Sequence, residues 1–166
     1  MSHSRAGVGW DSHRLVEGRA LVLGGVRVEH HLGLAGWSDA DVLTHAVMDA
    51  LIGAAGLGDI GQHFPDADER WRDADSIELL RTVRSMVGDV GVAAVHVDAT
   101  VMCEAPRLSP YRERMQTRLA DALGLVPGAV NVKFTTAEGM GWVGRGEGIG
   151  ALAIATVDSR GPSEPD

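Results

Sequence analysis

The sequence is poor in cysteine, aromatic residues and long apolar runs, and each shortage excludes a class of protein. The single cysteine, Cys103, cannot form a disulfide within the chain, which favours a reducing compartment. No apolar run reaches the roughly 18 residues of a membrane-spanning helix, and residues 1–6 are too short and polar for a signal peptide. With 4% aromatic residues and 22 glycines, the core must be mainly aliphatic and the turns tight. We therefore expect a cytoplasmic protein.

Positive charge is also scarce. The chain has 15 Lys and Arg against 23 Asp and Glu, which gives a net charge of −8. A nucleic-acid surface needs a clustered positive face, so this balance argues against a nucleic-acid partner. An acidic chain also repels an anionic substrate unless bound metal ions supply local positive charge.

The apolar pattern predicts one catalytic domain over 1–158, followed by a disordered polar tail over 159–166. It predicts strands at 6–13, 92–102, 130–135 and 149–157, a hairpin at 20–28, and helices at 39–55, 75–88 and 109–124. In the strand at 92–102, Val95, Val97, Ala99 and Val101 should share one face. These elements predict an α/β fold (α+β, two layers) with a mixed four-stranded sheet and helices packed on one face. Residues 56–73 are predicted to form a long functional loop.

The first strand and the first helix carry candidate metal ligands. Asp11 and His13 are two residues apart on the strand, so both side chains leave the same face, which Gly7 and Gly9 should keep open. His45, on the helix, can complete a three-ligand site. Zinc takes imidazole nitrogen and carboxylate oxygen, and a catalytic zinc keeps its fourth position free. The alternative is that Asp11 caps a turn and the histidines are surface groups.

The same helix predicts features around His45. Asp49 lies one turn beyond it and is expected to hold the imidazole tautomer. Ser38 or Asp39 is the expected N-cap. Met48 and Ile52 border this side, so we expect it to be covered, with another subunit as one candidate.

Two loops offer further polar groups. The loop at 56–73 carries Asp59, Asp66 and Asp68 among glycines that allow close approach of a ligand, or it is simply a solvated acidic loop. The glycine-rich loop near the C-terminus combines phosphate donors with a carboxylate for a hard cation, or its glycines serve only a tight connection; its candidates are Lys133, Thr135, Thr136, Glu138 and Arg145. The remaining histidines are expected at the surface or in loops: His3, His30, His31, His63 and His96.

Read in order, several motifs resemble one family over nearly the whole chain. These motifs are GVGWDSHRL, SDADVLTHAVMDALIGAAGLGDIGQHFPDAD, EAPRLSPY and VKFTTAEGMGWVGRGEGI. They are similar to the 2-C-methyl-D-erythritol 2,4-cyclodiphosphate synthase family of the non-mevalonate isoprenoid pathway. The resemblance implies a zinc-dependent phosphorus–oxygen lyase. Its reaction converts 4-diphosphocytidyl-2-C-methyl-D-erythritol 2-phosphate to the cyclic diphosphate and CMP by metal-assisted intramolecular phosphoryl transfer.

The resemblance also implies the assembly and the site. It implies a homotrimer with shared active sites and an axial cavity that can hold an isoprenoid diphosphate, with no membrane partner. Zinc would be held by Asp11, His13 and His45, and a second divalent cation, Mg²⁺ or Mn²⁺, by Glu138 with the substrate diphosphate. The implied substrate contacts are Asp11, His13, Trp37, Ser38, Asp59, Ile60, Gly61, Phe64, Asp66, Asp68, Cys103, Ala105, Pro106, Arg107, Leu108, Thr135, Thr136, Glu138, Trp142 and Arg145.

The chain departs from the family pattern at one catalytic position. The family commonly has histidine where this chain has Trp37, and that histidine is credited with stabilising the transition state. The role then passes to Thr136, zinc and backbone donors, or the activity is reduced. Ala137, Trp10 and Trp142 are further departures. Two other functions remain open: a zinc phosphoester hydrolase with Asp59 as base, and a non-catalytic trimer that binds isoprenoid diphosphate.

Overall fold

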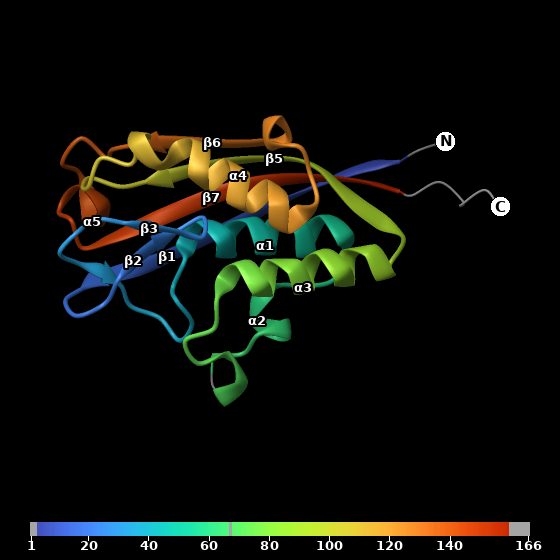
Figure 1. Ribbon diagram of the computed structural model, residues 1–166, viewed down its shortest axis with the longest axis horizontal. Coiled ribbons are helices and arrows are strands. Elements are labelled where there is room, and N and C mark those ends of the chain that lie inside the picture. Colours follow the sequence, from blue (N-terminus) through green and yellow to red (C-terminus); the bar gives the residue numbers. More distant parts are fainter. Residues whose placement is uncertain (1–2, 67, 160–166) are drawn as a thin grey trace.

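A five-stranded mixed sheet and three longer helices make up most of the computed structural model, which describes residues 3–66 and 68–159 (Figure 1). The strands are β1 (Ser4–Val16), β2 (Leu21–Leu23), β3 (Val26–Val28), β4 (Gly33–Leu34), β5 (Val92–Met102), β6 (Val130–Thr135) and β7 (Gly148–Ser159). The helices are α1 (Val42–Ala55), α2 (Ile60–His63), α3 (Ser76–Asp89), α4 (Arg112–Leu123) and α5 (Gly141–Gly144). Short 3-10 turns occur at η1 (Glu69–Trp71), η2 (Ser109–Tyr111) and η3 (Pro127–Ala129). No helix within 3–66 and 68–159 is long and apolar enough to cross a bilayer.

The sheet has the order β4-β1-β7-β5-β6, with β5 and β6 parallel and the other pairs antiparallel. The prediction of four strands was wrong, because β4 adds a fifth. This strand has only two residues, which pair with Leu15 and Val16 at the end of β1, so it is too short to show an alternating pattern. The strand β7 runs on to Ser159, one residue past the predicted domain boundary; the rest of the predicted tail lies outside the described residues.

The helix α1 lies against the middle of the sheet at unusually close range (Figure 1). A Cβ at Gly7 would collide with the backbone of Ala50 and Ala54, and one at Gly9 with the backbone of Ala46. The two glycines therefore do not leave the strand face open, as the sequence suggested, but let the helix approach it. This approach brings His45 to the side chains of β1.

The opposite face of the sheet is apolar but exposed. Val8 is 62% exposed and pairs across strands with Ile154, which is 47% exposed. Trp10 and its partner Leu152 are likewise exposed. A contiguous apolar face of this kind marks an interaction surface in a folded protein.

Two local predictions were wrong, and a third, that the Met48 and Ile52 side of the first helix is covered, was confirmed except for the suggested source of the cover. Val95 does not share the face of Val97 because the register of β5 against β7 shifts between Ala94 and His96, and this bulge turns Val95 outward. Residues 56–73 are not one irregular loop but contain α2 and η1. Met48 and Ile52 are fully buried within the chain itself, so no other subunit is needed to cover them.

Candidate metal and substrate site

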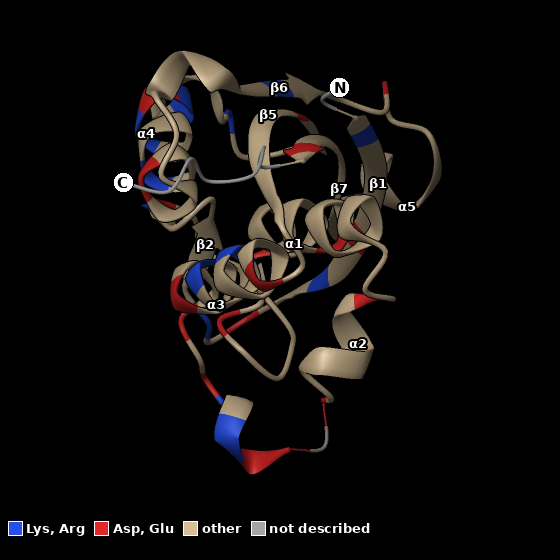
Figure 2. Ribbon diagram, turned by 90° about the vertical axis from the view of Figure 1, so that its right-hand side faces the viewer, with Lys and Arg blue, Asp and Glu red and all other residues tan. Residues whose placement is uncertain are grey.

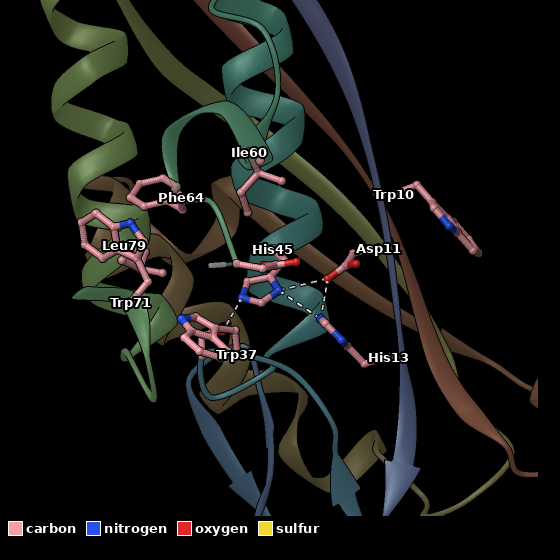
Figure 3. Close-up of a pocket in the computed structure, with 12 residues that line it drawn as sticks. Trp10, Asp11, His13, Trp37, His45, Ile60, Phe64, Trp71 and Leu79 are labelled. Atoms are coloured by element: carbon pink, nitrogen blue, oxygen red, sulfur yellow. Dashed lines mark hydrogen bonds and ion pairs between the residues drawn. The ribbon is translucent and has the colours of Figure 1, made fainter. Parts of the chain in front are cut away.

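Asp11, His13 and His45 converge at one point between β1 and α1 (Figure 3). Asp11 Oδ2 lies 3.0 Å from His13 Nε2 and 3.0 Å from His45 Nδ1. The two imidazole nitrogens are 3.3 Å apart. The other oxygen of Asp11 accepts a hydrogen bond from the N–H of Ser12 (2.8 Å), so each residue presents one atom to the common point.

The start of α1 fixes His45 in this place. The N-cap is Asp41 rather than the predicted Ser38 or Asp39, and its buried carboxylate accepts from the N–H (2.9 Å) and the hydroxyl (2.8 Å) of Thr44. The same carboxylate accepts from Gly24 N (2.8 Å) and Gly25 N (2.7 Å) at the turn of the β2–β3 hairpin. Because one carboxylate ties the hairpin to the helix, the first turn of α1 and His45 are held rigidly against β1.

The charges at the convergence point favour a cation there. Burial opposes ionisation of Asp11, but the hydrogen bonds and positive charges of His13 and His45 outweigh it and hold the pKa of Asp11 below its usual range. Burial also disfavours a charged His45, but the hydrogen bond to Asp11 and the nearby acidic charges raise the pKa of His45. The group therefore combines an ionised carboxylate with one imidazole, that of His45, whose surroundings favour positive charge.

The same geometry fits a tetrahedral zinc ion. Ligand atoms about 2.0–2.2 Å from a tetrahedral ion are about 3.3–3.6 Å from one another. The observed separations of 3.0–3.3 Å need to widen only slightly. Three nitrogen and oxygen donors leave the fourth position free, which is the pattern of a catalytic site rather than a structural one. Within the described part of the chain, no other group of His, Cys, Asp and Glu has this spacing.

The predicted role of Asp49 was wrong. Its carboxylate does not contact His45 but accepts a hydrogen bond from Ile60 N at 3.0 Å. Asp59 caps the short helix α2 by accepting from Gln62 N at 3.0 Å. The two aspartates thus hold the start of α2 over the side of α1, and Ile60 and Gly61 line a cavity next to the triad.

This cavity, about 210 Å³, is enclosed by several of the residues that the resemblance implied. Its walls include Asp11, His13, His45, Trp37, Ser38, Ile60, Gly61, Phe64 and Asp66, with Trp10, Trp71 and Leu79 as residues that the sequence analysis had not placed there. The indole N–H of Trp71 is buried without a partner among the described residues. Trp71 could not be found from the sequence, because nothing in the local pattern marks it as different from a core residue.

Trp37 closes one side of the cavity. Its indole N–H donates to the carbonyl oxygen of Asp68 at 2.9 Å, and the guanidinium of Arg72 lies 4.3 Å from its ring centre. The segment around η1 projects from the body of the fold and carries charged residues (Figure 2). Trp37 therefore anchors this projecting segment beside the triad. The carboxylate of Asp68 points elsewhere and pairs with Arg70.

A second cavity, about 320 Å³, lies at the carboxyl ends of β5 and β6. It is lined by Cys103, Glu104, Pro106, Arg107, Leu108, Ser109, Arg112, Phe134, Thr135 and Thr136. Burial raises the pKa of the Cys103 thiol to about 11, so this cysteine is a neutral wall residue and not a nucleophile. Ser109, where the predicted helix at 109–124 begins, accepts a hydrogen bond from the guanidinium Nε of Arg107 at 2.9 Å.

Glu104 shapes the loop that follows β6. Its two carboxylate oxygens accept from Ala137 N (3.0 Å) and Gly139 N (3.3 Å). Between these, Glu138 adopts a positive φ of 52° and accepts from the Thr136 hydroxyl at 2.9 Å. The sequence analysis did not single out Glu104, because its role depends on a loop more than 30 residues away.

The predicted residues thus form two separate groups. The triad lies between β1 and α1, and the second cavity lies at β6, on the far side of β7 and β5. Asp11, Ala151, Val101 and Phe134 follow one another across these strands. Three strand spacings place Asp11 and Phe134 about 14 Å apart. Trp142 and Arg145 line neither cavity, and Arg145 pairs with Glu147.

Comparisons with known proteins agree on one family. Residues 4–158 match the model of the YgbB family. A 2-C-methyl-D-erythritol 2,4-cyclodiphosphate synthase of Salinibacter ruber is 58% identical over 155 residues, which cover 93% of this chain and 99% of that protein. The bifunctional IspDF of Campylobacter jejuni has a similar structure, with a TM-score of 0.92 and 38% identity over 96% of this chain and 43% of that one. A cyclodiphosphate synthase solved in its CDP-bound form has a TM-score of 0.85 and 36% identity, covering 93% of this chain and all of that one.

Proposed function

Since the chain belongs to the YgbB family, we propose that it acts as a 2-C-methyl-D-erythritol 2,4-cyclodiphosphate synthase of the non-mevalonate isoprenoid pathway. The observation that carries this proposal is the convergence of Asp11 Oδ2, His13 Nε2 and His45 Nδ1 within 3.0–3.3 Å. Zinc held by these atoms would supply positive charge to neutralise the reacting phosphate oxygens. The single free cysteine supports the cytoplasm as its location.

The reaction needs positioning more than acid–base chemistry. An oxygen of the substrate's 2-phosphate forms a bond to the β-phosphorus of the cytidine diphosphate arm. The bond from that phosphorus to the bridging oxygen breaks, and CMP leaves with the electron pair. Because the nucleophile is already an anion and the leaving group is a phosphate, no strong base is required.

The residues of the triad cavity align the reacting groups. Ser38 is buried beside the triad, and its hydroxyl can donate to a phosphate oxygen. Arg19 holds the backbone there, since its guanidinium donates to the carbonyl oxygens of Gly36 (3.1 Å) and Ser38 (2.7 Å). Ile60, Gly61 and Phe64 exclude water from the other side.

The second cavity is the proposed cytidine pocket. CDP occupies two of the related structures, which supports a cytidine nucleotide as the ligand. Arg107 and the hydroxyls of Thr135 and Thr136 lie in its wall and suit the phosphates. Glu138, held by the Thr136 hydroxyl, is the proposed ligand of a second Mg²⁺ or Mn²⁺ ion that is bound mainly by the substrate diphosphate.

Trp37 is proposed to have a different role from the family's histidine. The indole N–H is the only donor of the Trp37 side chain, and it donates to Asp68 O, so this side chain is not free to donate to a phosphate. Stabilisation of the transferring phosphate then falls to the hydroxyl of Ser38 and to the metal, and to the Thr136 hydroxyl once Glu138 turns from it to the second cation. Trp37 contributes by holding the segment around η1 beside the cavity.

A homotrimer with shared sites is the proposed working form. Two of the three triad residues lie on β1, which pairs with β4 only at Leu15 and Val16, and the second cavity lies at the opposite edge of the sheet. Association of copies through the exposed apolar face can bring the triad of one copy to the nucleotide cavity of the next. It can also enclose an apolar axial cavity for an isoprenoid diphosphate, with Arg145 and Glu147 at one end.

The product distinguishes this function from zinc-dependent hydrolysis. In water enriched in ¹⁸O, the proposed reaction yields CMP and a cyclic diphosphate without solvent oxygen, as measured by mass spectrometry. A linear monophosphate that carries ¹⁸O would instead establish a hydrolase. The structure favours the cyclase, because Asp59, the base nominated for hydrolysis, caps α2 and does not line the triad cavity.

A further inference from the structure

The two ring nitrogens of His45 face different surroundings. Nδ1 faces the triad, 3.0 Å from Asp11 Oδ2. Nε2 faces away from it, 2.9 Å from Ser76 Oγ and 3.2 Å from Ser38 Oγ. The orientation of the ring is therefore set from outside the triad as well as from within it.

Ser76 is itself fixed by a carboxylate. It is completely buried at the first residue of α3. Its hydroxyl donates to Asp39 Oδ1, and its backbone N–H donates to Asp39 Oδ2 at 3.0 Å. Asp39 is tied back in turn, because its N–H donates to Ala74 O at 3.1 Å.

These hydrogen bonds determine which ring nitrogen of His45 carries the hydrogen, that is, the tautomer. A serine hydroxyl has one hydrogen, and here Asp39 accepts it. Ser76 Oγ can then only accept from His45, so Nε2 must carry the hydrogen of the ring. In neutral His45 the lone pair therefore lies on Nδ1, which is the atom that faces Asp11 and His13.

We propose that Ser76, oriented by Asp39, is a positioning residue that fixes the tautomer and ring orientation of His45 for metal binding. This inference rests on the metal site of the proposed function but not on the reaction. Histidine ligands generally donate their second N–H to a fixed acceptor, and loss of such an acceptor weakens metal binding about 10- to 100-fold. The inference also explains how a residue of α3, 31 positions from His45, acts on a site built from β1 and α1.

If Ser76 only stabilised the fold, its replacement would not weaken zinc binding specifically, and a matched control variant tests this. Thr82 lies on the same helix, and its hydroxyl also donates a hydrogen bond, to Glu78 O at 3.2 Å, but it is exposed and is neither a triad residue nor a wall of the triad cavity. In Ser76→Ala, zinc affinity measured by competition with a chromophoric chelator should fall about 10- to 100-fold. In Thr82→Ala, zinc affinity should stay within twofold of the parent. Equal zinc affinity in parent and Ser76→Ala would overturn the inference.

A measurement on the unchanged protein covers the case in which Ser76→Ala does not fold. In ¹⁵N-histidine NMR spectra of the zinc-loaded protein, His45 should bind through Nδ1 and show a slowly exchanging Nε2–H. Coordination through Nε2 would contradict the inference directly. If the parent protein binds no zinc at all, the proposed metal site fails; if the parent binds zinc through His45 Nε2, only the positioning role fails.

Discussion

Replacing His45 with alanine is expected to remove zinc from the protein and to lower CMP release at least about 1000-fold. The substitution leaves Asp11 and His13 as two ligands, and two ligands from one strand do not fix a tetrahedral ion. Loss of several kcal/mol of charge stabilisation, at 1.36 kcal/mol per tenfold change in rate, gives a reduction of this size. Zinc content should be measured by elemental analysis and CMP release by chromatography.

The fold should survive this change. The apolar face of α1 is formed by other residues, among them Leu43, Val47 and Leu51, all fully buried. Circular dichroism and the oligomeric state should therefore match the parent. His31→Ala is the matched control, because His31 is exposed and lies outside the triad. Retention of one zinc per chain by His45→Ala, with a rate within tenfold of the parent, would refute the assignment.

Placing charges on the exposed sheet face should abolish both assembly and activity. With Val8 and Ile154 both changed to aspartate, the proposed trimer must bury two neighbouring negative charges in every copy, at a cost of several kcal/mol for each ion. We expect light scattering to report monomers and CMP release to be lost, since each cavity alone carries only part of the substrate site. The triad itself is untouched, so each monomer should still bind zinc.

The control for this variant carries the same new charges elsewhere. Val90 is 46% exposed and Val126 is 72% exposed, and neither lies on a strand of the sheet. Changing both to aspartate should leave the trimer and its rate close to the parent. A fully active monomer of the Val8 and Ile154 variant would show that one chain holds a complete site.

The sequence predicted the main elements because their periodicity is local. The bounds of β5 and β6 were confirmed, and α1 ends at Ala55 with Gly56 in the left-handed conformation, as expected. Its beginning was less certain, because Ser38, Asp39 and Asp41 are all good caps. Only the tertiary contacts of Asp41 with the β2–β3 hairpin decide between them.

The candidate site was predictable where its residues lie on one strand or helix, and not where it depends on contacts between segments far apart in the sequence. Asp11 and His13 follow from strand alternation, and His45 was the candidate on the first helix that the family resemblance then supported. Helical spacing predicted Asp49 as the hydrogen-bond partner of His45. Asp49 instead accepts a hydrogen bond from Ile60 N, because α2 folds back over the side of α1. Ser76, on α3, is the partner instead, and no local pattern signals a contact between two residues 31 positions apart.

The most direct test of the account is anomalous diffraction at the zinc edge from crystals of the enzyme with CDP. We predict one peak per chain, about 2.0–2.2 Å from Asp11 Oδ2, His13 Nε2 and His45 Nδ1, with a phosphate oxygen as the fourth ligand. An anomalous peak at any other site, with none between these three atoms, would contradict it.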